Sequence, residues 1–310
     1  MASKGMDLCI QENYTTSLQY FDSLRTQYPE HPAGYFFTAA VIQSRMMDFE
    51  TQTGRDDFYC EIDTAISLAK QWTENEPDNA RAWFYLGAAK SYYSYQLGRE
   101  NRYLKAIRSG LDCIGDLKKS LDLDPECCDA LLGVGSYEYW RSYITRKINW
   151  LPFFSDHRKE GLAKLETVID CGTFTRWAAI SNLAWIYIEE KEYEKAITVS
   201  QKGLAAFPNT RFFLWPLAEA HFRNKDYKIA AVLFDQILAS VNSETENNHY
   251  NEILLNYKLG QCYHELEQYE LAMEHLNNAI RTTPAEEVEK RAREKQEKAF
   301  KLLAEINKKL

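Results

Sequence analysis

Cysteine and histidine are the side chains of this 310-residue chain that come closest to supporting chemistry. The seven cysteines show no Cys-x-x-Cys spacing, and none of the six histidines lies at finger-like spacing from a cysteine pair. We therefore expect no metal, no cofactor, and buried free thiols in a reducing or weakly oxidising compartment. The cysteines are Cys9, Cys60, Cys113, Cys127, Cys128, Cys171 and Cys262.

Catalytic motifs are absent from the sequence. There is no GxxxxGK phosphate loop, no GxGxxG turn, no HExxH and no GxSxG. The adjacent Cys127 and Cys128 come nearest, because the start of a helix can lower a thiol pKa, but no His or Lys lies near them in sequence. The sequence predicts a structural role for this pair, and it predicts that the chain is not an enzyme.

Charge narrows the partner classes. With 37 basic and 45 acidic residues the net charge is −8, which disfavours a nucleic-acid partner because an acidic chain repels phosphates. No apolar run approaches the ~20 residues that cross a bilayer, and the first ten residues are no signal peptide. As it stands the chain is predicted to be soluble and cytoplasmic.

Aromatic residues make up an unusually large share of the chain, 14%, and they supply contact area in cores and binding faces alike.

Two stretches of the chain align with each other: LAWIYIEEKEYEKAITVSQKGLAAFP, ending at Pro208, and LGQCYHELEQYELAMEHLNNAIRTTP, ending at Pro284. Both carry a Leu and a small residue, then an aromatic, a Tyr, an Ala and a Pro at the same spacing. The matching positions are Leu183, Ala184, Tyr187, Tyr193 and Ala196, and Leu259, Gly260, Tyr263, Tyr269 and Ala272. A third copy without its Pro runs from Leu217 to Phe234. This spacing resembles the 34-residue tetratricopeptide repeat, a helix–turn–helix unit.

The resemblance extends upstream in an enlarged form. Pro29, Pro77 and Pro125 are the other helix terminators, and the intervals between them are 48 residues each, longer than the repeat. The extra residues are expected between the two helices of a repeat, at about 46–57, 93–103 and 141–157. We predict enlarged repeats over 1–172, regular repeats over 173–284 and a capping helix over 285–310, forming one continuous array. The fold class is all-α, a right-handed superhelical solenoid of tetratricopeptide-type hairpins with a C-terminal cap.

The apolar period and the terminators predict the helices. They are expected at 3–11, 14–28, 32–48, 57–75, 79–97, 102–123, 127–143, 158–171, 175–189, 193–206, 211–223, 227–241, 249–266, 269–282 and 285–307. In this register Tyr14 and Gly5 take repeat positions, so Met1 would lie inside the first helix of a repeat. The alternatives are a frayed first helix and a removed leader, which would make the protein periplasmic or membrane-anchored.

The concave face of such an array is the candidate binding surface. Positions five, nine, twelve and thirteen of each first helix would line it, and aromatics recur there. The Lys/Asn clamp with which some tetratricopeptide proteins hold chaperone tails has no counterpart at these positions, so a more apolar ligand is expected. The alternative is that these aromatics fill the core. The predicted partner-binding residues are Tyr92, Trp140, Trp185, Trp215, Glu219, Arg223, Tyr257 and Gln261.

The stretch 141–160 is the most unusual in the chain, because it is locally basic and surrounds Pro152 with large apolar side chains. Three interpretations stay open: a loop that plugs the groove, a partner-docking finger, and an element that dips into a membrane surface. Its predicted contact residues are Trp150, Phe153 and Phe154. With its neighbours it resembles a bacterial subgroup of tetratricopeptide proteins and, distantly, the tetratricopeptide-39 type.

The function that these patterns favour is a non-enzymatic scaffold that binds a peptide or protein segment in an aromatic-rich groove. The alternative is a structural or assembly protein that self-associates or docks on a membrane-bound complex through residues 144–156. Both predict a protein partner, with membrane contact the less favoured case.

Overall fold

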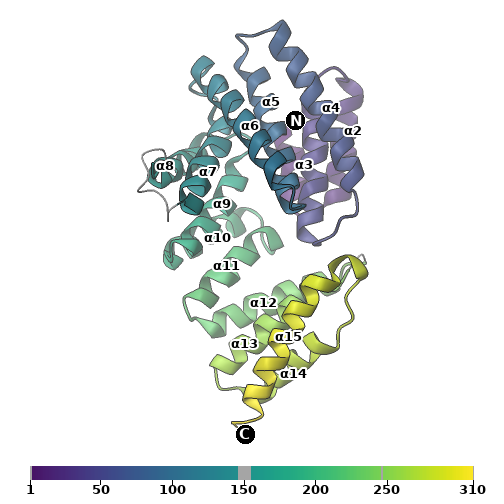
Figure 1. Cartoon of the computed structure of the whole chain (residues 1–310), viewed down its shortest axis with the longest axis vertical. Helices are drawn as coiled ribbons and strands as arrows, with labels where there is room; N and C mark the ends of the chain where they lie inside the picture. Colours follow the sequence, from purple (N-terminus) through teal and green to yellow (C-terminus); the bar gives the residue numbers. More distant parts are fainter. Residues whose placement is uncertain (1, 146–154, 246, 310) are drawn as a thin grey trace. The chain divides into compact units, whose positions relative to one another are not determined.

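The computed structural model describes residues 2–145, 155–245 and 247–309, and in that part of the chain it is all-α. Fifteen α-helices and one 3₁₀ turn follow one another there without a strand (Figure 1). Their bounds are α1 Ala2–Ile10, α2 Tyr14–Gln27, α3 Pro32–Asp48, α4 Arg55–Asn75, α5 Ala80–Arg99, α6 Tyr103–Leu123, α7 Cys128–Thr145, α8 Arg158–Cys171, α9 Arg176–Glu189, α10 Tyr193–Ala206, α11 Arg211–Arg223, α12 Tyr227–Asn242, α13 Tyr250–Glu265, α14 Tyr269–Arg281, η1 Glu286–Val288 and α15 Glu289–Ile306.

The predicted helices are confirmed, with ends that agree within two residues except at the last one. That helix was expected from residue 285, but the chain first forms the 3₁₀ turn η1 and enters α15 only at Glu289. The all-α class of stacked helix pairs is thereby confirmed as well. Two compact units make up the chain: unit 1 comprises 1–44 and 54–183, and unit 2 comprises 45–53 and 184–310.

One turn geometry recurs between the two helices of a pair. Six first helices are followed by a non-glycine residue with positive φ, between 54° and 68°. Left-handed backbone of this kind is uncommon for such residues, so its recurrence marks equivalent positions in both halves of the chain. The residues are Glu12, Glu50, Asn101, Lys191, Lys225 and Glu267. The second helix starts two residues later in five cases, whereas after Glu50 it starts only at Arg55.

Unit 1 contains the longest helices, because α4 and α6 have 21 residues each and α5 has 20. Its core is rich in aromatic rings. Phe37 stacks on Phe21 with centroids 5.1 Å apart and meets Phe174 edge-on at 5.4 Å, while Phe36 and Tyr85 pack beside it. Part of the aromatic surplus of the sequence is therefore core packing.

Small residues allow the helices of a pair to approach closely. In unit 1, Gly135 of α7 faces Gly161 of α8, and a Cβ on Gly161 would lie 2.6 Å from the carbonyl oxygen of Gly135 and 2.8 Å from the Tyr139 nitrogen. In unit 2, a Cβ on Gly260 of α13 would lie 2.6 Å from the Leu276 side chain of α14. The small residue at this repeat position therefore sets how closely the two helices of a pair can approach.

The C-terminal helix covers the end of unit 2. Val288, Ala292, Ala299 and Ile306 are all buried, and they pack with Leu276 and other apolar side chains of α13 and α14. Its remaining positions are dense in Lys and Glu, so one face is apolar and the other is solvated. Terminal repeats of a stacked array need such a polar outer face, which is the role predicted for this helix.

A disulfide joins Cys128 at the start of α7 to Cys171 at the end of α8. The expectation of free thiols is wrong for these two residues, since they lie 43 residues apart in sequence yet have Cα atoms 5.8 Å apart. The physical reason is the antiparallel pairing of α7 and α8, which brings the start of one helix beside the end of the other. The other five cysteines form no disulfide: Cys9, Cys113 and Cys262 are buried as expected and Cys127 is half-buried, but Cys60 is exposed, so the expectation of burial is wrong there.

Replacing Gly161 by alanine should destabilise the protein by about 1–3 kcal/mol, because the added methyl group meets backbone atoms of α7 that cannot rotate away. Gly115 of α6 is the matched control, since a Cβ there meets nothing within 4 Å, and Gly115→Ala should stabilise by about 0.5–1 kcal/mol. Urea unfolding of both variants tests this. Equal effects of the two substitutions would refute the close approach of α7 and α8.

Removing the disulfide by Cys128→Ser should lower the free energy of unfolding by about 2–4 kcal/mol, because the unfolded chain regains the freedom of the closed loop. Thermal melting of oxidised protein measures the change. Cys60→Ser is the control, because Cys60 is an exposed free thiol. A melting temperature that falls equally in both variants would contradict the assigned pairing.

Candidate functional site

The predicted binding residues fall in different units. Tyr92 and Trp140 belong to unit 1, whereas Trp185 and the five predicted residues that follow it belong to unit 2. In unit 2 these six residues lie on the last part of α9, residues 184–189, and on the next two first helices, α11 and α13. We describe this surface, the face of α9, α11 and α13, as the candidate site.

Tyr92 and Trp140 pack within unit 1. The Tyr92 ring meets Phe36 edge-on at 5.3 Å, and burial raises its pKa to about 12. The Trp140 indole contacts Tyr139 and Tyr143, and its Nε1 donates to the Asn182 side-chain oxygen at 3.4 Å. Both side chains have neighbours in their own unit, and their role in binding stays a prediction.

Aromatic side chains of unit 2 differ in how far they reach the surface. Trp185 on α9 is 38% exposed, the largest side chain of the candidate site that faces solvent to this extent. Trp215 on α11 is half-buried and packs on Phe234 and the core around it. Tyr257 on α13 is half-buried against the neighbouring core, and that burial raises the pKa of its hydroxyl. The Trp185 side chain is thus accessible to a ligand, whereas Trp215 and Tyr257 belong partly to the hydrophobic core.

A buried carboxylate organises the charges of this face. Glu219 on α11 is only 8% exposed and accepts from Arg223 Nε at 2.7 Å and from Lys258 Nζ at 2.8 Å. The hydrogen bond to Glu219 is the largest influence on Arg223 and raises the pKa of its guanidinium. A buried charge needs such partners, because an isolated carboxylate out of water is costly. Both cations are therefore held in place on the site.

Lys258 is a functional candidate that sequence reasoning missed. It lies on α13 with its ammonium 4.2 Å from the Phe222 ring centroid, so Glu219 and an aromatic face share it. The signal in the sequence was its place beside the predicted Tyr257, in the repeat after Glu219. Gln261 on the same helix is half-buried.

The repeat register relates these side chains to one another. The aligned Leu183, Leu217 and Leu259 place Trp185, Glu219 and Gln261 at equivalent positions of three successive first helices. One turn further along come Glu189, Arg223 and Glu265, and Glu189 lies close enough to contribute to the raised pKa of Arg223. The face thus presents the exposed indole of Trp185 on α9 and the ion-paired Glu219 and Arg223 on α11.

Apolar side chains on α6 form a second surface that the sequence did not reveal. Tyr103, Leu104, Ile107 and Leu111 recur at helical spacing, and each is more than half exposed, with Leu104 at 87%. Contiguous exposed apolar side chains of this kind mark interaction surfaces. Only the local packing of unit 1 shows that this stripe faces outward, since the same periodicity also describes a helix facing a core.

Three further expectations concern the predicted loop, a metal site and a membrane-spanning helix. Trp150, Phe153 and Phe154 of the predicted loop lie outside the described residues. In the described residues, no group of three His, Cys, Asp or Glu side chains is placed to hold a metal ion. Among the described helices, none combines the length and the apolar character that crossing a bilayer requires.

Sequence comparison identifies repeats in the second half of the chain. The model of the tetratricopeptide repeat matches residues 212–285, and a second model of the same repeat matches residues 178–210. Residues 178–210 and 212–285 are therefore tetratricopeptide repeats, and the recurring helix pairs elsewhere in the described chain have the same helix–turn–helix architecture. No curated protein sequence matches it.

Solved structures with a similar fold include three that align over most of the chain. The crystal structure of the APC/C hetero-tetramer Cut9-Hcn1 has a TM-score of 0.56 and 16% identity over 89% of this chain. The human IFIT1 dimer with m7Gppp-AAAA has a TM-score of 0.51, with 10% identity over 95% of this chain and 64% of that one. PilW, a type IV pilus biogenesis factor, has a TM-score of 0.50, with 15% identity over 84% of this chain and 98% of that one. The chain spans only 45% of the first of these, and identities this low support the shared fold alone.

Proposed function

We propose that this protein is a non-enzymatic scaffold that captures an extended or helical protein segment on the α9–α11–α13 face of unit 2. The observation that carries the proposal is Trp185, an indole left 38% exposed on a rigid helix. Exposed Trp anchors supply large contact area at low entropic cost, and they are the residue type most enriched at binding hot spots.

The charge cluster defines the chemistry of the ligand. Glu219 is buried, and its carboxylate is already paired with Arg223 and Lys258. The Arg223 side chain nevertheless stays 48% exposed. A fixed, exposed guanidinium suits a carboxylate or a main-chain carbonyl. We therefore infer a ligand segment with an apolar side chain for Trp185 and an acceptor for Arg223.

Trp185→Ala should abolish most partner capture while lowering the free energy of unfolding by no more than about 1.5 kcal/mol, since the side chain is 38% exposed and only partly packed. Loss of a Trp anchor lowers affinity by about 30-fold or more. Quantitative mass spectrometry of proteins retained from source-cell extract by the immobilised wild type and variant measures the loss. Trp215→Ala should instead destabilise by about 2–4 kcal/mol, because that ring packs on Phe234.

Val232→Ala is the matched control for capture, because Val232 is 66% exposed on the second helix α12, away from the first-helix face. Partners lost with Trp185→Ala but kept with Val232→Ala are those that use the candidate site. Identical sets of retained proteins for wild type and Trp185→Ala would refute the proposed binding face.

Assembly is a second candidate function, and the stripe on α6 is the observation that favours it. The exposed Leu104, Ile107 and Leu111 can pair with the same stripe of a second copy about a two-fold axis. The sequence alternative placed self-association on residues 144–156, so the α6 stripe is a different surface for the same function.

Leu104→Asp combined with Ile107→Asp should raise the dissociation constant of any self-association by about 100-fold, because both carboxylates would enter the apolar contact. Sedimentation velocity over a concentration series measures this. Ile229→Asp with Val232→Asp is the matched control, since these residues form an exposed apolar pair with the same spacing on α12. A wild type that stays monomeric throughout the series would exclude assembly through α6.

A further inference from the structure

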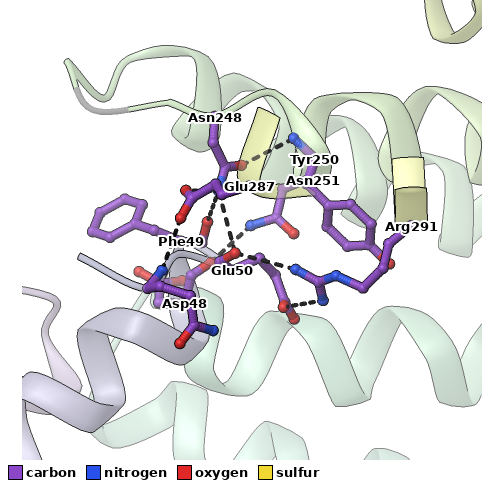
Figure 2. Close-up of polar contacts among 9 residues, drawn as sticks. Asp48, Phe49, Glu50, Asn248, Tyr250, Asn251, Glu287 and Arg291 are labelled. Atoms are coloured by element: carbon purple, nitrogen blue, oxygen red, sulfur yellow. Dashed lines mark hydrogen bonds and ion pairs between the residues drawn. The ribbon is translucent and has the colours of Figure 1, made fainter. Parts of the chain in front are cut away.

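A segment from the first half of the sequence lies in unit 2. Residues 45–53 comprise the last turn of α3 and the loop after it, and they pack beside the N-terminal ends of α11, α13 and α15 (Figure 2). Within it, Asp48, Phe49 and Glu50 carry most of the polar contacts drawn, and Glu50 has the left-handed φ of 54° that bends the chain. We call residues 48–52 the inserted turn.

The main chain of the inserted turn is held by side-chain amides and a guanidinium. Asn251 Nδ2 donates to the Asp48 carbonyl oxygen at 2.7 Å, and Asn248 Nδ2 donates to the carbonyl oxygens of Phe49 at 3.0 Å and Glu50 at 3.3 Å. Arg291 Nη2 donates to the same Glu50 oxygen at 3.2 Å. Contacts of this kind bind a peptide backbone whatever its side chains are.

Glu287 completes this set of main-chain contacts from η1. Its Oε2 accepts from the Gln52 N–H at 3.0 Å, and its Oε1 accepts from Asn248 Nδ2 at 3.1 Å. Burial alone would raise the pKa of Glu287, but these hydrogen bonds outweigh it and lower the pKa. The carboxylate is therefore the form that the inserted turn binds.

The side chains of the inserted turn are recognised by two cations. Arg211 binds the Asp48 carboxylate through both oxygens, with Nε–Oδ1 at 3.0 Å and Nη2–Oδ2 at 2.6 Å, and its guanidinium lies 5.5 Å from the Phe49 ring centroid. Arg291 Nη1 binds the Glu50 carboxylate at 2.7 Å. Paired charge-assisted hydrogen bonds from arginine select a carboxylate at a defined distance and angle. The selected sequence is an acidic residue, an aromatic residue and a second acidic residue.

Unit 2 positions these recognition groups with its own residues. Arg211 is only 2% exposed, and its Nη1 also donates to Ser240 at 2.7 Å and to Glu244 at 2.9 Å on α12 and the residues after it. The Arg291 guanidinium lies 4.5 Å from the Tyr250 ring centroid, and Asn248 accepts from the Tyr250 N–H at 3.1 Å. None of these contacts involves an atom of the inserted turn, so we expect the site to be pre-organised, which lowers the entropic cost of binding.

We propose that unit 2 carries a second, edge-located binding site for an Asp-aromatic-Glu turn of a partner protein, and that the chain fills this site with its own residues 48–52 until the partner displaces them. This site uses the ends of α11, α13 and α15, and it involves none of Trp185, Glu219 or Arg223. The chain's own turn competes at a high effective concentration because it is tethered. Partner binding at this edge is therefore weak in the resting chain and strong once the inserted turn is withdrawn.

A peptide of residues 44–54, SRMMDFETQTG, with blocked ends and a fluorescent label is the probe. Full-length Asp48→Asn/Glu50→Gln keeps the size of both side chains but removes both ion pairs, and Arg211 keeps Glu244 as a partner. Fluorescence polarisation should show the peptide binding this variant at least about ten-fold more tightly than the wild type. Adding Arg291→Gln to the variant should remove the gain, because the partner of the peptide's second carboxylate is lost.

A peptide with Asn and Gln in place of its two acidic residues is the matched control and should bind no protein in the series. Trp185→Ala in the same background should leave peptide binding unchanged. This experiment therefore tests the inserted-turn site separately from the proposed binding face of α9, α11 and α13. Equal binding by wild type and a variant with wild-type helix content would overturn the proposal. A wild-type dimer that the peptide dissociates would assign the site to a second copy and overturn the assignment to a different partner.

A measurement on the wild type does not depend on how the variants fold. Excess peptide should displace the inserted turn and so free the Gln52 amide, which donates to Glu287 in the resting chain. Hydrogen exchange of that amide should accelerate by about ten-fold or more in saturating peptide. Unchanged exchange at Gln52 under peptide concentrations that saturate the Asp48→Asn/Glu50→Gln variant would overturn displacement.

Discussion

Close approach of paired helices is the constraint on which the rest of this structure depends. Where α7 meets α8, Gly135 and Gly161 place backbone against backbone, and there is no room for a methyl group. That contact fixes the spacing of the pair, and the same spacing brings Cys128 within bonding distance of Cys171. Each pair then exposes one apolar side that only the next pair or a cap can bury.

Sequence patterns predicted the helices and the repeat class because these depend on local order. Period, terminating prolines and small residues are visible in the chain itself, and the matched turns at Lys191, Lys225 and Glu267 follow from them. The disulfide was missed because pairing depends on which helix ends become neighbours, a property of the fold and not of cysteine spacing. The inserted turn was missed for the same reason, since Asp48 and Arg211 are 163 residues apart.

The candidate face was predictable in part. The repeat register gave Trp185, Glu219 and Arg223, but it could not separate a groove residue from a core residue, because both are large and recur at the same position. Packing makes that separation: Trp215 has a core partner in Phe234, and Trp185 keeps an exposed surface. The repeat register could not identify Lys258, because its partner is Glu219 on α11, two helices earlier in the chain.

The final helix, α15, has two structural roles. Its apolar face closes the stack through Ala292, Ala299 and Ile306, while Arg291 beside Ala292 holds Glu50 of the inserted turn. Any change in the length or phase of α15 therefore alters solubility and recognition at once. An insertion or deletion within α15 that is not close to a whole number of helical turns would rotate its two ends relative to each other and disturb one of the two faces.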